Sequence, residues 1–177
     1  MAIKTDIRDM VHKYDDYFEV GREKVREFAK AVKNDHPSHY DEEAAAELGY
    51  DGLMAPLTFV STVALLVQQD FFRKVDTGFE TMQIVQVDQQ FIYHKPIKVG
   101  DRLYPVMEVH SVNERFGADI VVTRNTLTNQ DGEVVLEAFT TMMGQQGEQS
   151  AKIKFDRETG QVTRVADPEE PAAAGTD

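Results

Sequence analysis

The chain has 177 residues, a hydrophobic fraction of 41% and a formal net charge of −12. This length suits one domain that buries a substantial core, and the negative charge argues against nucleic acid, whose phosphates would be repelled. The sequence contains no cysteine, which excludes disulfides, thiolate metal ligands and a thiol nucleophile.

No targeting or membrane-spanning segment is predicted. The first six residues lack the apolar stretch of a signal peptide. The longest apolar run, residues 57–67, is interrupted by hydroxyl side chains and is shorter than the ~20 residues that a membrane span needs. We therefore expect a cytoplasmic protein without a membrane span.

Three helices are predicted in the first half of the chain. Residues 21–33 carry one apolar face at helical spacing, formed by Val25, Phe28, Ala29 and Val32. Residues 41–49 begin with acids, continue with alanines and end at Gly49, a natural helix stop. Pro56 suits the first turn of a third helix, and residues 57–72 are apolar in almost every direction. Such a helix is expected to be surrounded by other structure.

Four long strands and a small hairpin are predicted in the second half. The strands are rich in Val, Ile, Phe and Thr and span residues 82–94, 103–112, 118–127 and 133–143. The short turn segments between them predict antiparallel neighbours. The hairpin is predicted from residues 153–155 and 162–165. Helices followed by antiparallel strands indicate an α+β domain in which a curved sheet wraps around one buried helix.

The folded domain is predicted to span residues 1–166. The remaining residues, 167–177, are acidic, proline-containing and rich in alanine. Because they offer no large apolar side chain to bury, we expect a disordered acidic tail.

Residues 33–40 concentrate groups that hold or move a proton: two imidazoles, a carboxylate, an amide and a phenol. Pro37 disfavours helical geometry at the preceding residue, so the first helix is predicted to end near Asn34. Two interpretations remain open for this loop. It is either a polar turn capped by Asn34 and Asp41, or a functional loop whose side chains are aimed by the scaffold.

Other kinds of site find no support in the sequence. There is no glycine-rich phosphate loop and no Gly-x-Ser-x-Gly elbow. Only His36 and His39 are close together among the histidines, and no zinc motif surrounds them, so we predict neither a metal nor a cofactor. His94 and His110 fall on predicted strands and are interpreted as polar-face residues.

Several separated blocks carry a resemblance that covers nearly the whole chain apart from the tail. The sequence resembles the hot-dog-fold, MaoC-like (R)-specific hydratases and dehydratases. Within them it is most similar to the accessory, C-type subunit of the heterodimeric (3R)-hydroxyacyl-ACP dehydratase of type II fatty acid synthesis, which elongates mycolic acid precursors. The blocks are residues 22–29, 53–59, 83–89 and 116–123.

The resemblance implies an altered active site. Active members carry a six-residue signature, Asp-x-Asn-Pro-x-His, in which x is any residue. Its Asp and His move the substrate's protons. With Pro37 as the anchor, Asn34 stands at the Asp position and His39 at the His position. An amide does not act as a general acid or base. In addition, Leu57 replaces the glycine whose N–H polarises the thioester carbonyl, and its side chain crowds that approach.

The family resemblance therefore implies a subunit that works with a catalytic B-type partner. The partner would supply the Asp and His, and this chain would shape the site for a long acyl chain carried by acyl carrier protein. Buried CH₂ groups gain about 0.8 kcal/mol each. The predicted acyl contacts are Leu57, Phe59, Val60, Val63 and Leu66, although ordinary core packing stays an alternative for each.

Two further functions stay open. In the first alternative, the chain is a self-sufficient (R)-specific enoyl hydratase that uses His39 together with Asp35, the residue after Asn34. As a third possibility it is a non-enzymatic module for acyl-thioester binding or assembly.

Overall fold

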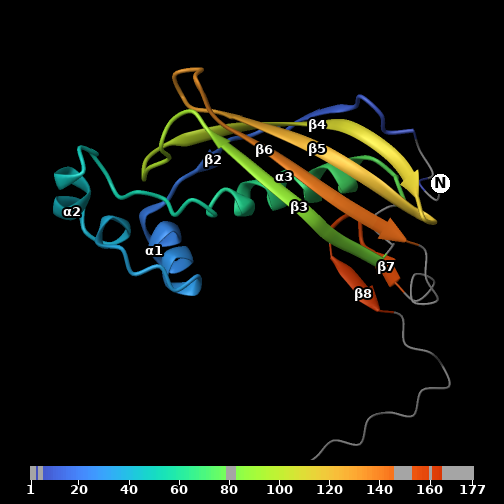
Figure 1. Ribbon diagram of the computed structural model, residues 1–177, viewed down its shortest axis with the longest axis horizontal. Coiled ribbons are helices and arrows are strands. Elements are labelled where there is room, and N and C mark those ends of the chain that lie inside the picture. Colours follow the sequence, from blue (N-terminus) through green and yellow to red (C-terminus); the bar gives the residue numbers. More distant parts are fainter. Residues whose placement is uncertain (1–2, 4–5, 79–82, 146–152, 160, 165–177) are drawn as a thin grey trace, which may run out of the picture.

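The computed structural model describes residue 3 and residues 6–78, 83–145, 153–159 and 161–164. Figure 1 shows its helices and strands. The first half contains β1 (Val11–Lys13), β2 (Phe18–Glu19), α1 (Arg22–Ala31), the 3₁₀ helix η1 (Pro37–His39), α2 (Glu42–Glu47) and α3 (Ser61–Lys74). The second half contains β3 (Gln83–Tyr93), β4 (Arg102–Arg115), β5 (Ala118–Thr128), β6 (Val134–Gln145), β7 (Ile153–Phe155) and β8 (Val162–Arg164).

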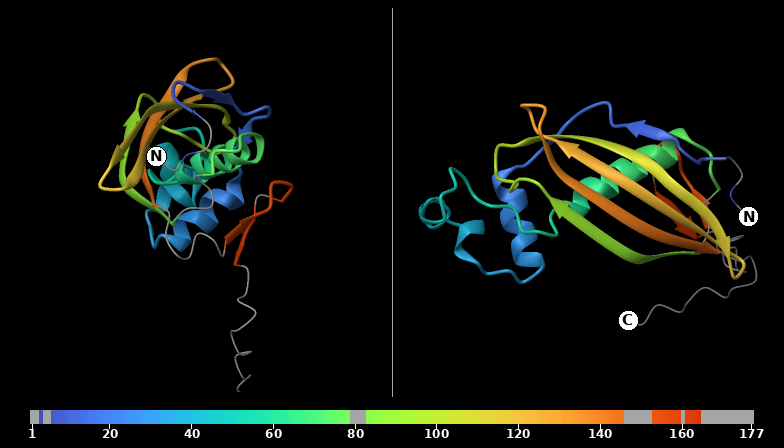
Figure 2. Two further views of the ribbon diagram at one scale, coloured as in Figure 1. Left: turned by 90° about the vertical axis from the view of Figure 1, so that its right-hand side faces the viewer. Right: turned by 45° about the horizontal axis from the view of Figure 1, so that its top comes forward.

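One antiparallel sheet dominates the molecule and curls around α3 (Figure 2). Its strand order is β1-β4-β5-β6-β3, and β2 also pairs with β4. The helices α1 and α2 lie beyond one end of the sheet, whereas β7 and β8 lie at the other end (Figure 1). This arrangement confirms the predicted α+β hot-dog class, with an antiparallel sheet around a central helix.

The prediction that consecutive strands pair is wrong for β3 and β4. β4, β5 and β6 pair in chain order, but β3 pairs with β6 and occupies the edge of the sheet. The connector between β3 and β4 does not form a tight turn, because its backbone bonds to residues 53–55 instead. The Ala55 N–H donates to Ile97 O, and the Val99 N–H donates to Leu53 O, each at 2.9 Å.

The first two helices follow local sequence signals. α1 buries Val25 and Ala29 completely, and it ends at Ala31, slightly before the predicted end near Asn34, because Lys33 adopts a left-handed conformation with φ 56°. α2 begins at Glu42 and is capped by Asp41, whose carboxylate accepts two backbone N–H groups. The end of α1 and the cap of α2 are therefore set by residues within a few positions of each helix.

α3 differs from its prediction in two respects. It begins at Ser61 rather than residue 57, because residues 57–60 form turns. It is also not surrounded on nearly all sides, since Leu65 is 55% exposed on a stripe with Ser61 and Gln69. The sheet covers only the side of the helix that carries Val63, Val67, Phe71 and Phe72.

Two apolar clusters lie between α3 and the sheet. The first, called the proximal cluster, packs around the N-terminal half of α3 and includes Phe59, Val60, Val63, Leu127 and Leu136. The second, called the distal cluster, packs around its C-terminal half and includes Ile7, Val67, Phe71, Phe72, Met107, Val109, Val121 and Met142. The helix therefore has two differently lined ends.

The predicted C-terminal hairpin is present as β7 and β8, which pair in antiparallel fashion. Residue 82 of the first predicted strand, residue 165 of the hairpin and the predicted tail, residues 167–177, lie outside the described residues. Within the described part of the chain, no helix has the length and apolar character to cross a membrane.

Candidate active site

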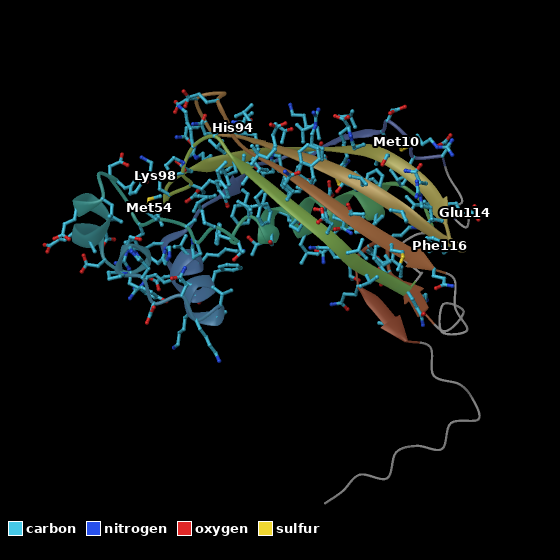
Figure 3. The ribbon with its side chains drawn as sticks, in the orientation of Figure 1. Met10, Met54, His94, Lys98, Glu114 and Phe116 are labelled. Atoms are coloured by element: carbon cyan, nitrogen blue, oxygen red, sulfur yellow. The ribbon has the colours of Figure 1, made fainter. Side chains whose placement is uncertain are left out.

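Residues 53–55 bring the loop that carries His39 next to the start of α3. This segment is held by the β3–β4 connector, and on η1 by the Met54 N–H, which donates to Ser38 O at 2.9 Å. Met54 and Lys98 lie side by side near the helical end of the molecule (Figure 3), where they form an isolated antiparallel bridge. The predicted loop is therefore tied, through residues 53–55, to the β3–β4 connector.

His39 is 8% exposed, and one hydrogen bond fixes its ring. Its Nδ1 lies 2.7 Å from the carbonyl oxygen of Met54. Because a carbonyl only accepts, Nδ1 carries the hydrogen, and in the neutral ring Nε2 holds the lone pair. His39 thus keeps one ring nitrogen able to accept a proton.

The described residues give His39 no carboxylate hydrogen-bond partner. The Asn34 amide oxygen accepts the N–H of His36 at 3.2 Å, and its backbone oxygen accepts the Tyr40 hydroxyl at 2.8 Å. Asp35 is exposed and makes no hydrogen bond or ion pair within the described chain. The structure therefore places Asn34, Asp35 and His39 on one loop without joining them into a dyad.

The remaining polar groups of this loop have structural partners. The Nδ1 of His36 lies 2.9 Å from the Ser38 hydroxyl and accepts the Ser38 N–H at 3.3 Å, which caps η1. Asp41 Oδ1 accepts the N–H groups of Glu43 and Ala44 at 2.7 and 3.0 Å. The capping interpretation is thus confirmed for Asp41, while Asn34 stabilises the turn rather than a helix.

The turn before α3 presents Leu57 to solvent. Its side chain is 70% exposed, and within the described residues no group accepts a hydrogen bond from its backbone N–H.

The Leu57 carbonyl accepts the hydroxyl of Tyr93. Burial raises the pKa of Tyr93 to about 12, so this phenol stays a donor at neutral pH. The sequence analysis did not identify Tyr93 as a site residue. The sequence shows only that it is an aromatic residue at the end of a predicted strand.

The other predicted acyl contacts lie inside the protein. Phe59, Val60 and Val63 are between 0 and 2% exposed in the proximal cluster, and Leu66 is partly buried against it. Ring contacts with Phe18 and Phe28 surround Phe59. Only Leu57 among the five predicted contacts is freely accessible in the isolated chain.

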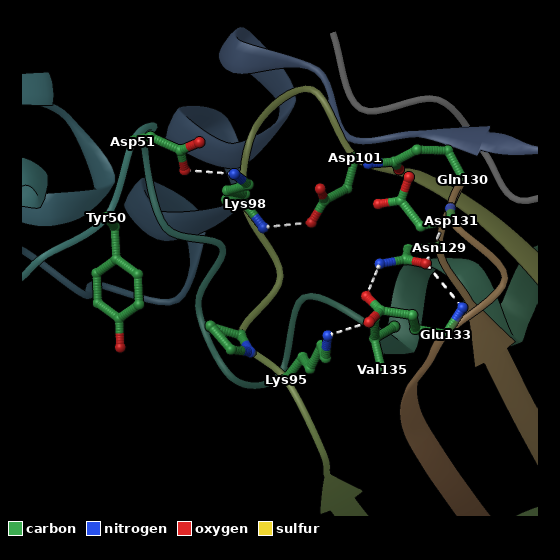
Figure 4. Close-up of a pocket in the computed structure, with 11 residues that line it drawn as sticks. Tyr50, Asp51, Lys95, Lys98, Asp101, Asn129, Gln130, Asp131, Glu133 and Val135 are labelled. Carbon is green, nitrogen blue, oxygen red and sulfur yellow. Dashed lines mark hydrogen bonds and ion pairs between the residues drawn. The ribbon is translucent and has the colours of Figure 1, made fainter.

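A polar cleft of about 270 Å³ lies beside the β3–β4 connector (Figure 4). Its two lysines are neutralised: Lys95 pairs with Glu133 at 2.5 Å, and Lys98 pairs with Asp51. Neither His39 nor Leu57 lines it. Paired charges suit neither an acyl chain nor a phosphate, so we assign the cleft no part in the candidate site.

The remaining histidines lie away from this site. His12 pairs with Asp70 at 2.9 Å, His94 with Glu137 at 3.1 Å, and His110 with Glu108 at 3.9 Å. His94 follows β3 rather than lying within it, which corrects its predicted place on a strand. In the portion of the chain that the structure describes, no group of three or more potential ligands is arranged to hold a metal ion.

Comparison with known proteins identifies the family. Residues 10–138 match the model of the FAS1-like dehydratase domain region. The chain belongs to this dehydratase family. It is 66% identical to the UPF0336 protein Rv0637 of Mycobacterium tuberculosis over 166 residues, which cover 94% of this chain and all of that protein.

Solved structures of the dehydratase family share the fold. The crystal structure of the C-terminally truncated HadBC (3R-hydroxyacyl-ACP dehydratase) complex from Mycobacterium tuberculosis contains a chain that is 63% identical. Its TM-score is 0.75, and the match covers 80% of this chain and all of that one. A MaoC-like dehydratase is 36% identical with a TM-score of 0.75, and the match covers 85% of this chain and 49% of that one. A dehydratase domain of this kind thus occurs both in a complex and within a chain of about twice its length.

The residues around His39 depart from the signature that the resemblance implies. The signature that the resemblance implies pairs a histidine with a carboxylate, whereas here an amide stands at position 34 and the histidine binds a carbonyl. The site retains a proton acceptor, and its described groups include no carboxylic acid within hydrogen-bonding reach of that acceptor.

Proposed function

We propose that this chain is the accessory subunit of a heterodimeric (3R)-hydroxyacyl-ACP dehydratase of type II fatty acid synthesis, acting on mycolic acid precursors. The observation that carries the proposal is the chemistry around His39: an amide at position 34 and a carbonyl partner in place of a carboxylate. A general acid needs a proton that it can release near neutral pH, and Asn34 has none.

The partner subunit would perform the chemical step. Its base removes the α-proton of the 3-hydroxyacyl thioester, the double bond forms between the α- and β-carbons, and the β-carbon to oxygen bond breaks. Its acid protonates the departing hydroxyl, so that water and a trans-2-enoyl thioester leave. This chain would contribute apolar surface at Leu57 and along α3, where each buried CH₂ group gains about 0.8 kcal/mol.

The edge strand β3 supports a partner of similar fold. In the described part of the chain it pairs only with β6, so its other edge presents unpaired backbone groups. Its side chains include Val85, Val87 and Ile92, which are 49%, 52% and 37% exposed. An open edge with apolar side chains suits a second sheet of the same kind, which would bury both.

The test is hydration of a trans-2-enoyl thioester by this chain alone and by its complex with a B-type catalytic subunit. We expect turnover only in the complex. Removing the partner's Asp or His should abolish turnover, whereas His39→Ala in this chain should leave most of it. A purified chain that is indifferent to a B-type subunit would contradict the proposal.

The same experiment distinguishes the two other functions. The free Nε2 of His39 favours a self-sufficient hydratase as the second candidate, and that enzyme would be active alone and inactivated by His39→Ala. A non-enzymatic acyl-binding module would bind acyl thioesters while the turnover of the partner stayed the same with and without it.

A further inference from the structure

The distal cluster and the C-terminal half of α3 line a small apolar compartment. This end of α3 lies away from α1 and α2 (Figure 1). A cavity of about 10 Å³ remains there between side chains that include Ile7, Phe72 and Met142. This volume holds about one water molecule. The compartment is therefore almost full in the isolated chain.

The β7–β8 hairpin is held against this compartment by Phe155 and Arg157 of the hairpin and by Arg73 of α3. Phe155 packs against the distal cluster. Arg157 Nη1 donates to the Phe72 carbonyl oxygen at 2.9 Å. Arg73 reaches from the helix in the opposite direction and donates to two carbonyl oxygens of the hairpin turn, those of Arg157 at 3.1 Å and Glu158 at 2.7 Å. Helix and hairpin thus hold each other reciprocally.

This attachment is specific but lies at the surface. Phe72 O lies in the last turn of α3, and the C-terminal end of a helix favours a cation nearby. Arg157 also pairs with Asp76 at 2.6 Å, but their side chains are 38% and 61% exposed, and exposed ion pairs contribute little. Strands of three residues are not stable alone. The hairpin should therefore open at a lower free energy than the sheet.

One side of α3 connects the candidate site to this compartment. Val60 and Val63 are predicted acyl contacts, and Val67 and Phe71 continue the same side at helical spacing. Fourteen residues of α3 span about 21 Å. This line leads from Leu57 to the distal cluster at the far end, and because its side chains are 0–3% exposed, a hydrocarbon chain that follows it must displace them.

We propose that the β7–β8 hairpin is a clasp that sets how far a long acyl chain extends along α3, with Arg73 and Arg157 as specificity-determining residues. This inference rests on the proposed function. Because the compartment is almost full, a chain that enters it must displace the hairpin from the end of α3, and the contacts of Arg73 and Arg157 between hairpin and helix resist that displacement. Met107 and Met142 line the compartment, and their unbranched side chains repack readily around hydrocarbon.

The clasp itself is tested by amide hydrogen exchange on the complex of the full chain with its catalytic partner. Arg157→Gln removes the charged contacts to Phe72 and Asp76, so exchange at residues 71–75 should accelerate about tenfold while β5 stays protected. Arg115→Gln, a matched change at the distant β4–β5 turn, should leave exchange at residues 71–75 unchanged. Unaltered exchange in Arg157→Gln would overturn the clasp.

Its role in specificity is tested by the turnover of a short and a long trans-2-enoyl thioester by the same complexes. We expect Arg157→Gln to raise the ratio of kcat/KM for the long over the short substrate severalfold, and Arg157→Lys to restore most of the original ratio. An equal change for both substrates, or none, overturns the specificity role. A wild-type complex inactive on both overturns the proposed function and this role together, while hydrogen exchange still decides whether the clasp exists.

Discussion

The ring of His39 donates its Nδ1–H to the Met54 carbonyl, which orients Nε2 and leaves it without a proton in the neutral form. A carboxylate partner would also stabilise the charged ring after proton transfer, and a backbone carbonyl supplies only a dipole. The position therefore keeps the geometry of a base and lacks the charge that a working dyad provides. The missing charge therefore follows from two residues: the amide at Asn34 and the carbonyl-bonded ring of His39.

Also at the residue scale, the contrast between Phe59 and Leu57 separates core packing from substrate contact. Phe59 is 0% exposed and Leu57 is 70% exposed. Phe59→Ala should lower the free energy of unfolding by about 3–5 kcal/mol because it leaves a cavity. Leu57→Ala should change it by less than about 0.5 kcal/mol, while lowering turnover of long substrates by the complex.

Urea denaturation and the hydration assay measure these two effects on the same preparations. A large loss of stability in Leu57→Ala would show that its side chain is packed in solution. In that case Leu57 would be a core residue and not an acyl contact.

Tyr93 gives a pH dependence whose sign follows from its raised pKa. Burial raises the pKa of Tyr93 from the ordinary 10.0 to about 12, so the unfolded chain loses this proton first. The stability that depends on the neutral phenol is complete below pH 10 and falls as the pH rises from 10 towards 12. Tyr93→Phe should remove this fall and cost about 1 kcal/mol at neutral pH, because the bond to Leu57 is lost.

Urea denaturation at several alkaline pH values measures this difference. The other five tyrosines are present in both proteins, so the difference between the two stability curves isolates Tyr93. Parallel curves for the wild type and Tyr93→Phe would contradict the assignment.

At the scale of elements, the proposed function assigns different roles to the two edges of the sheet. β1 forms one edge and β3 the other, and each carries an exposed valine: Val11 is 65% and Val87 is 52% exposed. A lysine on an edge strand opposes pairing with another sheet, because the charge would be buried. Val87→Lys should therefore weaken association with the catalytic subunit by at least about tenfold, whereas Val11→Lys should leave it intact.

Co-purification and titration calorimetry measure the association, and thermal unfolding of each isolated variant checks that the fold is retained. Normal association of Val87→Lys would exclude β3 as the partner surface. A loss in Val11→Lys alone would move the interface to the β1 edge.

The elements also show how far sequence patterns reach. Strand bounds agree with prediction within a few residues, because alternation and turn residues act locally. The predicted neighbours β3 and β4 do not pair, because the connector finds its hydrogen bonds on residues 53–55, far away in sequence. α3 was expected to be surrounded because its composition is apolar, but burial depends on what packs against it, and Leu65 stays exposed.

At the scale of the whole molecule, both ends of the described chain are fastened to the C-terminal half of α3. On one side, His12 and Asp15 bind Asp70 and Lys74 of the helix at 2.9 and 2.7 Å. On the other side, the hairpin binds through Arg157 and Arg73. The N-terminal end of the helix, by contrast, leads to the exposed turn at Leu57. This asymmetry places the candidate site at one end of α3 and the proposed length control at the other.

The sequence by itself determined the family, the α+β hot-dog class, the approximate strands and the caps, because periodicity, turn chemistry and motif residues act within short stretches of chain. Only the tertiary structure decided the order of strands, the bond between His39 and Met54, the contact of Tyr93 with Leu57 and the docking of the hairpin on α3. Each of these joins residues far apart in sequence. Such pairings form when the folded chain satisfies backbone groups and excludes water, which no local pattern specifies.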